Sequence, residues 1–404
     1  MVVMNEKKKK LVPALRFSGF EGDWEVKELK KACTINPKNK ELSDSFIYID
    51  LESVSDGLLH KENLVQKSNA PSRAQRVLEK NDILFQMVRP YQKNNFFFNK
   101  DGFFVASTGY AQMRTTNEAQ YIYQYIHTEL FVNKVNVRCT GTSYPAINSS
   151  DLSNIKISIP TLPEQQKIAN FLSSVDKKIE QLRQKVSLLE EYKKGVLQQI
   201  FSQQIRFKED DGTAFADWEV KKLGEVSDKV NSKNKNNLVN FVLTNSATQG
   251  IVSQQDYFDK DIANQNNLGG YYIVDKDDFI YNPRISKAAP VGPVKRNKLI
   301  KGVMSPLYTV FRFSKGNLAF LEYFFETPKW HKYMKSIANY GARHDRMNIT
   351  SIGFQKMPIP FPSLPEQQKI ANYLSSLDNK IEQVQTQLKE AEQFKKGLLQ
   401  QLFV

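Results

Sequence analysis

Four stretches of this sequence place arginine beside glycine, asparagine, tyrosine or proline, a combination suited to contacts with nucleic acid. They span residues 70–77, 88–95, 282–287 and 339–348. A guanidinium presents a planar fork of N–H donors that matches phosphate oxygens and the edge of guanine, whereas Asn and Gln match adenine. A single stretch of this kind is more often an ordinary surface loop. Because corresponding stretches occur in both halves of the chain, we interpret the set as candidate nucleic-acid contacts.

The charge of the chain supports this interpretation. Among 404 residues, 57 are Lys or Arg and 43 are Asp or Glu, which gives a formal net charge of +14. A basic excess of this size favours an anionic partner such as DNA. The run Lys7–Lys10 is basic on its own, and it is either a disordered tail or an arm that binds phosphate.

The sequence contains no recognisable catalytic motif. It has neither a G-x-x-x-x-G-K-[ST] loop nor a G-x-G-x-x-G turn, and its four histidines lack metal-ligand spacing. Asn282-Pro283 is followed by Arg and Ile, not by the second proline and the aromatic residue of an adenine-amino methyltransferase. Cys33 and Cys139 are too few for a disulfide framework. We therefore predict a chain without intrinsic enzymatic activity, metal or cofactor.

Length and hydropathy limit the class of protein. A chain of 404 residues can form two or three domains, each with a core of its own. The sequence has no run of 18 apolar residues and no signal-peptide pattern at its start. We expect a cytoplasmic protein without a membrane partner.

An internal repeat organises the chain. Residues 162–201 and 364–403 agree at 25 of 40 positions without a gap. A weaker match, DWEVKEL at 23–29 and DWEVKKL at 217–223, opens each half, and the regions between these matches have diverged. The period is far too long for a solenoid. The repeat predicts two diverged globular units, each followed by one shared element.

The shared element is predicted to be a long helix. Each copy opens with a hydroxyl residue, a proline and a glutamate, as Thr161-x-x-Glu164 and Ser363-x-x-Glu366, which indicates a capping box. Apolar residues then alternate in steps of four and three, the a/d pattern of a coiled coil. The seam residues are Ile168, Leu172, Val175, Ile179, Leu182, Val186 and Leu189 in the first copy, and Ile370, Leu374, Leu377, Ile381, Val384 and Leu388 in the second.

Lys193 and Lys395 interrupt this seam at the same place in both copies. A polar residue on a seam can fix helix register, or its stem can lie along a fraying helix end with its charge in water. Two matched helices in one chain can form an antiparallel hairpin about a pseudo-twofold axis, or each can pair with another protein. Arg16-Phe17 matches Arg206-Phe207, so the start of the chain supplies what would follow the second helix. We therefore expect the two termini to lie close together.

The regions before the helices are predicted to be α+β domains. Short β-rich runs occur at 46–54, 81–88 and 270–282. Helical patterns occur at 117–130 and 317–340. The predicted fold class is α+β, with two pseudo-twofold-related globular recognition domains separated by two long helices that form an antiparallel coiled coil.

The segments SIPTLPEQQKIANFLSSVDKKIEQL and PIPFPSLPEQQKIANYLSSLDNKIEQV, together with DWEVKKLGE, SRAQRV and NDILF, resemble the specificity subunit of type I restriction–modification enzymes. The resemblance covers almost the whole chain after the basic tail. The first unit departs from it slightly, with VKELKK where the second has VKKLGE.

This resemblance implies two target recognition domains, each of which reads one half of a split site in double-stranded DNA. It implies that the helices set the spacing of the half-sites and dock two modification (methyltransferase) subunits. Those subunits would bind S-adenosylmethionine, and restriction (translocase/nuclease) subunits would use ATP and Mg. The implied domains are a basic tail at 1–15, recognition domains at 16–161 and 204–361, and spacer helices at 162–203 and 362–404.

Recognition domains vary most where they read bases, so the DNA-binding residues are predicted from their types alone. They are Arg73, Arg76, Arg89, Tyr91, Lys93, Thr142 and Ser143 in the first domain, and Arg284, Lys287, Arg343, His344 and Arg346 in the second. Two other interpretations remain open at this point. One is a coiled-coil scaffold without a DNA role, and the other is a nuclease.

Overall fold

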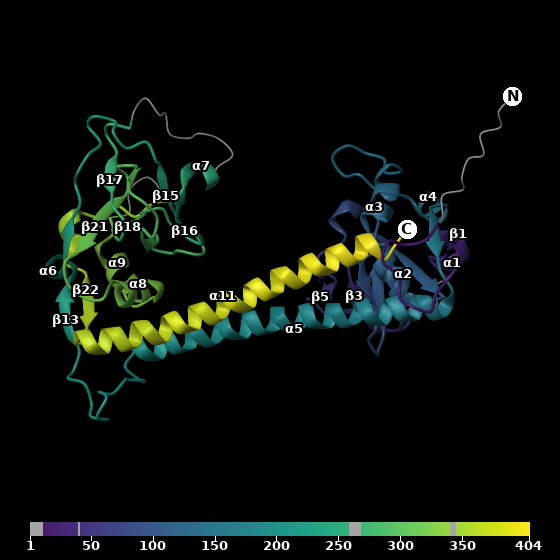
Figure 1. Cartoon of the computed structure of the whole chain (residues 1–404), viewed down its shortest axis with the longest axis horizontal. Coiled ribbons are helices and arrows are strands. Elements are labelled where there is room, and N and C mark those ends of the chain that lie inside the picture. The colour runs from purple at the N-terminus through teal and green to yellow at the C-terminus, as the bar shows by residue number, and fades with distance from the viewer. Residues whose placement is uncertain (1–10, 39–40, 258–267, 340–344) are drawn as a thin grey trace. The chain divides into compact units, whose positions relative to one another are not determined.

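A computed structural model describes residues 11–38, 41–257, 268–339 and 345–404. The chain divides into two compact units (Figure 1). The first unit contains residues 1–184 and 385–404, and the second contains residues 185–384. Within the described residues, none of the helices combines the length and the apolar character that a membrane crossing requires.

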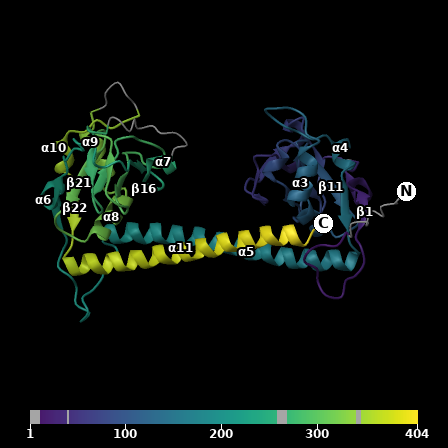
Figure 2. The same cartoon turned by 45° about the horizontal axis from the view of Figure 1, so that its top comes forward.

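Two long helices contribute to both units. They are α5 (Leu162–Phe201) and α11 (Leu364–Gln401), close to the limits that the repeat predicts. Within each unit the start of one helix lies beside the end of the other, so the two run antiparallel (Figures 1 and 2). In the first unit Arg183 of α5 donates to Glu392 of α11 at 2.7 Å, and in the second unit the hydroxyls of Tyr192 and Tyr373 lie 3.0 Å apart. The helices therefore pair with each other, as the first of the two alternatives predicts.

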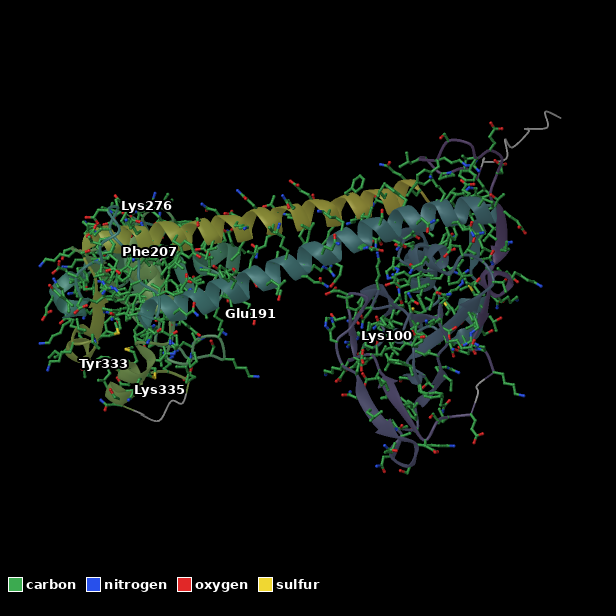
Figure 3. The ribbon with its side chains drawn as sticks, turned by 90° about the horizontal axis from the view of Figure 1, so that it is seen from below. Lys100, Glu191, Phe207, Lys276, Tyr333 and Lys335 are labelled. Carbon is green, nitrogen blue, oxygen red and sulfur yellow. The ribbon has the colours of Figure 1, made fainter. Side chains whose placement is uncertain are left out.

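The predicted seam faces inward. Every seam residue is buried or half-buried, and Leu172 and Leu374 are fully buried. By contrast, Glu191 lies off the seam of α5 and is exposed (Figure 3). The heptad pattern thus correctly separates the inner and outer faces of both helices.

The first unit is built on two four-stranded sheets. One has the order β6-β3-β10-β7, in which β10 is parallel to β3, and the other is an antiparallel sheet of order β2-β11-β8-β9. Two-stranded pairs β1-β12 and β4-β5 complete the unit. The strands are β1 (Glu25–Glu28), β2 (Cys33–Ile35), β3 (Ser45–Ile49), β4 (Val54–Ser55), β5 (Leu58–Leu59), β6 (Asn63–Gln66), β7 (Ala74–Val77), β8 (Ile83–Gln86), β9 (Phe96–Phe97), β10 (Phe104–Ser107), β11 (Tyr110–Thr115) and β12 (Lys156–Ile159). The helices are α1 (Leu29–Ala32), η1 (Lys67–Asn69), η2 (Pro90–Gln92), α2 (Ala119–Tyr125), α3 (Glu129–Asn136) and α4 (Ser149–Ser153).

The second unit repeats part of this plan. Its antiparallel sheet β14-β21-β18-β19 corresponds to β2-β11-β8-β9, and its pair β13-β22 corresponds to β1-β12. Pairs β15-β16 and β17-β20 complete the unit, and the antiparallel pair β17-β20 corresponds to β7-β10 of the first unit. The strands are β13 (Glu219–Lys222), β14 (Ser227–Lys229), β15 (Leu243–Ser246), β16 (Gly250–Ser253), β17 (Tyr272–Val274), β18 (Phe279–Tyr281), β19 (Val294–Arg296), β20 (Gly302–Met304), β21 (Thr309–Phe313) and β22 (Pro358–Phe361). The helices are α6 (Leu223–Val226), α7 (Gln254–Tyr257), α8 (Leu318–Glu326), α9 (His331–Ile337) and α10 (Ser351–Gln355).

The core of each unit includes the ends of both long helices. In the first unit Leu172 of α5 and Leu402, just after α11, pack in one cluster with Tyr121 and Phe131. In the second unit Leu374 of α11 and Ile200 of α5 pack in one cluster with residues of β18, β21 and α8. A buried aromatic or aliphatic side chain contributes about 1.5–3 kcal/mol. The ends of the helices are therefore parts of the globular cores.

Three predicted patterns are each divided between two elements. The helical pattern at 317–340 forms α8 and α9, and α8 ends at Glu326, two residues before Pro328. Proline disfavours helical backbone at the residue before it, which explains the break. The pattern at 117–130 likewise forms α2 and the start of α3, and the strand pattern at 270–282 forms β17 and β18 with a turn between them. These differences concern only element boundaries.

The N-terminal segment meets the end of α11. The amide of Leu15 donates to the carbonyl of Gln401 at 2.9 Å, and Trp24 donates to Leu11. This confirms the predicted proximity of the two ends for the described residues. Residues 11–15, which the resemblance assigns to the basic tail, are attached here, whereas Lys7–Lys10 lie outside the described residues.

Candidate nucleic-acid interface

Two loops of the first unit meet side by side and carry most of its predicted contacts. They are residues 87–95 and 139–147, joined by a β-bridge between Val88 and Ala146. The amide of Arg89 donates to Pro145 at 2.7 Å, and the amide of Ile147 donates to Met87 at 3.0 Å. We call these two loops the first loop pair. It brings residues 50 positions apart in sequence to one place.

Arg89 is held in an unusual conformation within this pair. Its φ of 52° lies in the left-handed region, which costs an L residue about 1–2 kcal/mol. The guanidinium lies 4.3 Å from the centre of the Tyr144 ring, within the range of a cation–π contact. Its buried Nε atom has no hydrogen-bond partner. Tyr144 was not among the predicted residues, although an aromatic residue beside Thr142 and Ser143 was visible in the sequence.

The other predicted residues of the first domain divide into two groups. Tyr91, Thr142 and Ser143 are exposed on the first loop pair, and Lys93 in the same pair forms an ion pair with Glu129 at 2.7 Å. Arg73 and Arg76 instead lie at β7, in the other sheet. Arg73 is exposed, whereas Arg76 is half-buried, and burial lowers its pKa. No contact in the described part of the chain joins these two arginines to the first loop pair.

The second unit has a corresponding pair of loops. Arg284 and Arg346 form a β-bridge, the amide of Ile285 donates to Asp345 at 3.0 Å, and the amide of Met347 donates to Pro283 at 2.9 Å. We call residues 282–287 and 345–348 the second loop pair. Lys287 is exposed at its edge. The predicted contacts Arg343 and His344 lie outside the described residues.

The two loop pairs occupy equivalent places in the repeat. NDILF at 81–85 aligns with DDFIY at 277–281, so Val88 aligns with Arg284, and Ala146 aligns with Arg346 through Gly141 and Gly341. The bridge joins the aligned residues in each unit. The backbone frame is therefore shared, but its side chains differ.

An ion pair between a partly exposed arginine and a buried aspartate, which was not predicted, occurs just before β8 in the first unit and just before β18 in the second. Arg114 donates to both carboxylate oxygens of Asp82 at 2.8 and 2.7 Å, and Arg312 donates to both oxygens of the aligned Asp278 at 2.6 and 3.0 Å. Both aspartates have no exposed surface. Hydrogen bonds from Arg312 and Lys301 also lower the pKa of Asp275, next to this pair in space, against the effect of burial. The aligned aspartates in NDILF and DDFIY were the sequence signal for this contact.

Another ion pair, which also occurs once in each unit, attaches each long helix to its unit. Arg16 donates to both carboxylate oxygens of Glu164 at 2.8 Å, and Arg206 donates to Glu366 at 3.2 and 2.9 Å. We call these the anchoring ion pairs. The prediction that Glu164 and Glu366 close capping boxes is wrong, because among the described residues neither accepts a hydrogen bond from a backbone amide of its own helix. The arginines compete successfully because a bidentate charged contact is stronger than a hydrogen bond to a neutral amide.

The glutamine that follows each of these glutamates forms hydrogen bonds to the start of a neighbouring short helix. Gln165 donates to the carbonyl of Pro160 at 2.9 Å, and its oxygen accepts from the amide of Glu118 at the start of α2. Gln367 donates to Pro362 at 2.8 Å and accepts from Asn317 at the start of α8. The repeated LPEQQ sequence therefore attaches each long helix to the unit that it follows.

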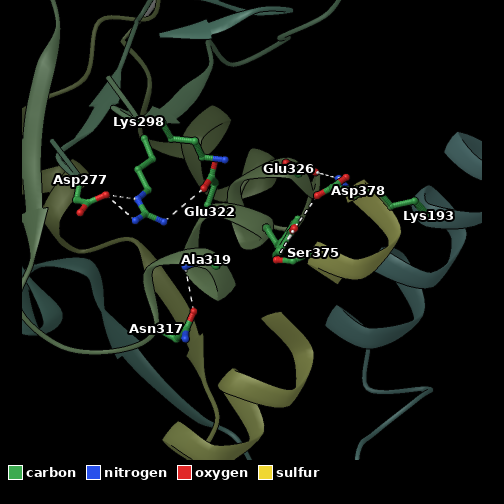
Figure 4. A network of polar contacts seen from close by, with 11 residues as sticks. Lys193, Asp277, Lys298, Asn317, Ala319, Glu322, Glu326, Ser375 and Asp378 are labelled. Atoms are coloured by element: carbon green, nitrogen blue, oxygen red, sulfur yellow. Dashed lines mark hydrogen bonds and ion pairs between the residues drawn. The ribbon is translucent and has the colours of Figure 1, made fainter. Parts of the chain in front are cut away.

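The two lysines that interrupt the seam have carboxylate partners on the opposite helix. Lys193 of α5 contacts Asp378 of α11 at 2.7 Å, and Lys395 of α11 contacts the aligned Asp176 of α5 at 2.6 Å. Lys193 also contacts Glu326 of α8 at 3.0 Å (Figure 4). Burial opposes the charged form of Lys193, but the two carboxylates raise its pKa overall. These reciprocal contacts favour the first alternative for the lysines, a role in helix register.

Metal ligands are not gathered in the part of the chain that the structure describes. Within it, no three His, Cys, Asp or Glu side chains are grouped closely enough to hold a metal ion. The surface at the loop pairs instead includes Arg, Lys, Tyr and hydroxyl residues, together with the exposed Asp345 beside Arg346. Such a surface can bind phosphate and base edges.

Comparison with known proteins agrees with this geometry. The family described as the type I restriction modification DNA specificity domain matches twice, at residues 21–191 and 216–393. The MjaVIII specificity subunit of Methanocaldococcus jannaschii is 24% identical, with 93% of this chain and 91% of that protein covered. A putative MjaX specificity subunit of the same organism is 25% identical, with 93% and 92% covered.

Solved structures share the fold. The S subunit of a type I restriction–modification system from M. genitalium has a TM-score of 0.56 at 14% identity, with 97% of this chain and 99% of that chain covered. A chain from a study of complex assembly and conformational transition of the type I R-M system has a TM-score of 0.55 at 20% identity, with 94% and 97% covered. The prediction of the family and of the fold class is therefore confirmed. With two matched domains that span most of its length, the chain belongs to the family of type I restriction–modification specificity subunits, non-catalytic proteins with two target recognition domains.

Proposed function

We propose that the two recognition domains, at 16–161 and 204–361, each bind one half of a bipartite site in double-stranded DNA. The observation that carries this proposal is the pair of equivalent loop pairs. Both have the same backbone bridge, but Val88 and Ala146 stand where Arg284 and Arg346 stand in the other unit. A shared frame with different side chains is what two readers of different half-sites require.

The DNA contacts are proposed residue by residue. In the first domain Arg89, Tyr91, Lys93, Thr142 and Ser143 would contact DNA through the first loop pair, and Arg73 and Arg76 would do so from β7. In the second domain Arg284, Lys287 and Arg346 would contact DNA through the second loop pair, and Arg343 and His344 belong to the same proposal. The net charge of +14 favours phosphate contacts throughout.

The two long helices would serve a different partner. We propose that α5 and α11 set the spacing of the half-sites and dock two modification subunits, since the repeat keeps both helices alike while the domains diverge. S-adenosylmethionine would then be bound by the modification subunits, and ATP and Mg by restriction subunits. The cytoplasm, where such a complex would meet DNA, is the proposed location.

Methylome sequencing tests the proposal. Cells that express the modification subunits with this chain should contain a methylated motif with two separated halves, and cells without the chain should not. Arg89→Gln and Lys276→Gln form a matched pair, because each removes one positive charge but Lys276 is exposed and lies outside both loop pairs (Figure 3). Arg89→Gln should impair methylation of the motif, whereas Lys276→Gln should not, which separates the loss of a DNA contact from the loss of a charge. Absence of any motif that depends on this chain would overturn the proposal.

A further inference from the structure

A cavity of about 480 Å³ opens beside the second loop pair. Its walls come from β15, the second loop pair and the turn at 305–308, and they include Thr244, Asn245, Asn282, Arg284, Tyr308 and Arg346. This volume lies within the range of about 300–1,000 Å³ that is usual for small-molecule sites. The cavity is therefore large enough for one organic group the size of a nucleobase.

The lining of this cavity differs in charge from the cavities of the first unit. Among the residues that the structure describes, its lining contains two arginines, three tyrosines and several amide and hydroxyl groups but no carboxylate, and one of the arginines, Arg346, is paired with Asp345 outside the lining at 3.7 Å. The cavities of about 390, 340 and 520 Å³ in the first unit each contain at least two carboxylates. Compared with those three cavities, the cavity beside the second loop pair offers an anionic ligand with an aromatic ring more favourable charges and stacking surfaces.

A buried amide in the wall lacks a partner. Asn245 is 3% exposed, and its Nδ2 donates to the carbonyls of Ile280 at 2.8 Å and Pro293 at 3.3 Å. Its Oδ1 has no hydrogen-bond partner. A buried polar atom of this kind is rare in a folded protein and calls for an explanation. Each DNA base has an N–H group that could donate a hydrogen bond to this oxygen, but the oxygen is covered in this structure, so the Asn245 side chain would have to turn toward the cavity.

The first unit closes the equivalent place with its own side chains. Gln86, which aligns with Asn282, is buried and donates to Gln92 at 3.0 Å, while its oxygen accepts from the amide of Asn94 at 3.0 Å. Val88 and Ala146 stand where the two arginines of the second unit stand. The cavity is thus a feature of one recognition domain and does not follow from the shared frame.

We propose that this cavity binds a single nucleobase turned out of the DNA duplex, with Asn245 as acceptor, a tyrosine as stacking surface, and Arg284 and Arg346 at the adjoining phosphates. A base inside the duplex cannot enter a concave site, so the nucleotide must leave the stack. The inference rests on the proposed function, because it assigns a specific device to the second recognition domain. A free nucleotide has the same chemistry and is the alternative source of the base.

The test uses the full chain alone with duplexes of its methylation motif, so that no modification subunit can extrude a base. 2-Aminopurine is placed at one position at a time in each half-site, and both its emission and the anisotropy of a labelled duplex end are recorded. We expect emission to rise about threefold or more at one position of the half-site read by the second domain, as unstacking relieves quenching. Asn245→Leu, which has no acceptor, and Arg346→Gln should remove this rise, and Lys276→Gln, which loses the same charge as Arg346→Gln but outside the cavity, should retain it.

Each outcome has a distinct meaning. Specific binding without any rise in emission would overturn the cavity proposal and leave the proposed function intact. Absence of sequence-dependent binding would overturn both. Calorimetric titration with each of the four deoxynucleoside monophosphates forms the second arm. Binding of one of them that Arg346→Gln abolishes, without a rise in duplex emission, would assign the cavity to a free nucleotide and overturn the DNA proposal. Tyr308→Ala, which removes a ring of the cavity wall and its hydroxyl contact to Thr244 at 3.4 Å, provides a second variant in case Asn245→Leu does not fold, and it should also lower the rise in emission.

Discussion

The two units place the same residues at the same positions wherever the long helices attach, and different residues wherever DNA would be read. The anchoring ion pairs, the LPEQQ contacts and the Arg–Asp pairs recur in both units with similar distances. The loop pairs share only their backbone. Around the seam lysines the units also differ, because Lys193 contacts two carboxylates, whereas Lys395 contacts Asp176 and lies near His127. The two units therefore share one backbone arrangement, and they differ in the side chains that this backbone carries.

The largest expected effect concerns the anchoring ion pairs. Glu164→Ala and Glu366→Ala each remove the buried carboxylate to which an arginine donates two hydrogen bonds. This loss costs about 3 kcal/mol of unfolding free energy, at about 1.5 kcal/mol for each charge-assisted bond, although Arg206 keeps its contact with Asp217 at 3.4 Å. Glu366→Ala should cost more, because Glu366 also accepts from Trp218 at 3.0 Å, whereas the aligned Trp24 has no partner for its Nε1. Chemical denaturation with hydrogen exchange of each unit measures the change.

The exposed Glu191→Gln serves as the control and should leave the exchange pattern unchanged. Equal protection in the unit that contains the alanine and in wild type would contradict the assigned role of the anchoring ion pair.

The next expected effect is a pH dependence of stability that differs between the two units. Burial and the neighbouring Lys395 lower the pKa of His127 to about 4. Because the unfolded histidine has a pKa near 6.5, the unfolded chain binds the proton first, and the stabilisation present above about pH 6.5 is lost as the pH falls toward 4. We expect a loss of about 1–3 kcal/mol in the first unit over this window.

His127→Gln should remove this part of the pH dependence, as measured by hydrogen exchange at pH 7 and at pH 4.5. The second unit has Glu326 at the equivalent place near its seam lysine, so His127→Gln should leave the pH dependence of that unit unchanged. Burial lowers the pKa of His331, which gives the second unit a loss of its own that His127→Gln does not affect. An unchanged pH dependence in His127→Gln would show that another group titrates.

A smaller effect compares the seam lysines. Lys193→Met leaves Glu326 and Asp378 facing each other without a cation, and should cost about 1–2 kcal/mol. Lys395→Met leaves only Asp176, so its cost should be lower. Denaturant midpoints of the two variants measure the difference. A larger loss for Lys395→Met would contradict the comparison of the two sites.

The smallest effect concerns Tyr144. Tyr144→Ala removes the ring beneath the Arg89 guanidinium, a contact worth about 0.5–1 kcal/mol at an exposed site. The affinity for the half-site of the first domain should fall by a few-fold, as fluorescence anisotropy with wild-type and scrambled half-sites can show. An equal loss for both half-sites would place Tyr144 outside the reading surface of its domain.

Much of the architecture was accessible from the sequence. The repeat and the heptads predicted the two helices, their antiparallel pairing and the inward seam, because helical periodicity is a local property. The anchoring ion pairs and the Lys193–Asp378 contact were not predicted, although all their residues recur in both halves. Such contacts join positions more than 140 residues apart, and periodicity does not disclose which charged residues meet across a fold. The cavity beside Arg284 was not predicted for the same reason, since Asn245 reaches it from β15 and Tyr308 from the turn at 305–308.

The central claim is that each recognition domain reads its own half-site. It is tested by selecting bound duplexes from a library in which both halves of the methylated motif are randomised, using wild type, Arg89→Gln and Arg346→Gln. We expect Arg89→Gln to relax the base preference in one half only, and Arg346→Gln to relax it in the other half only. Relaxation of the same half by both variants, or an unchanged preference in both, would contradict the account.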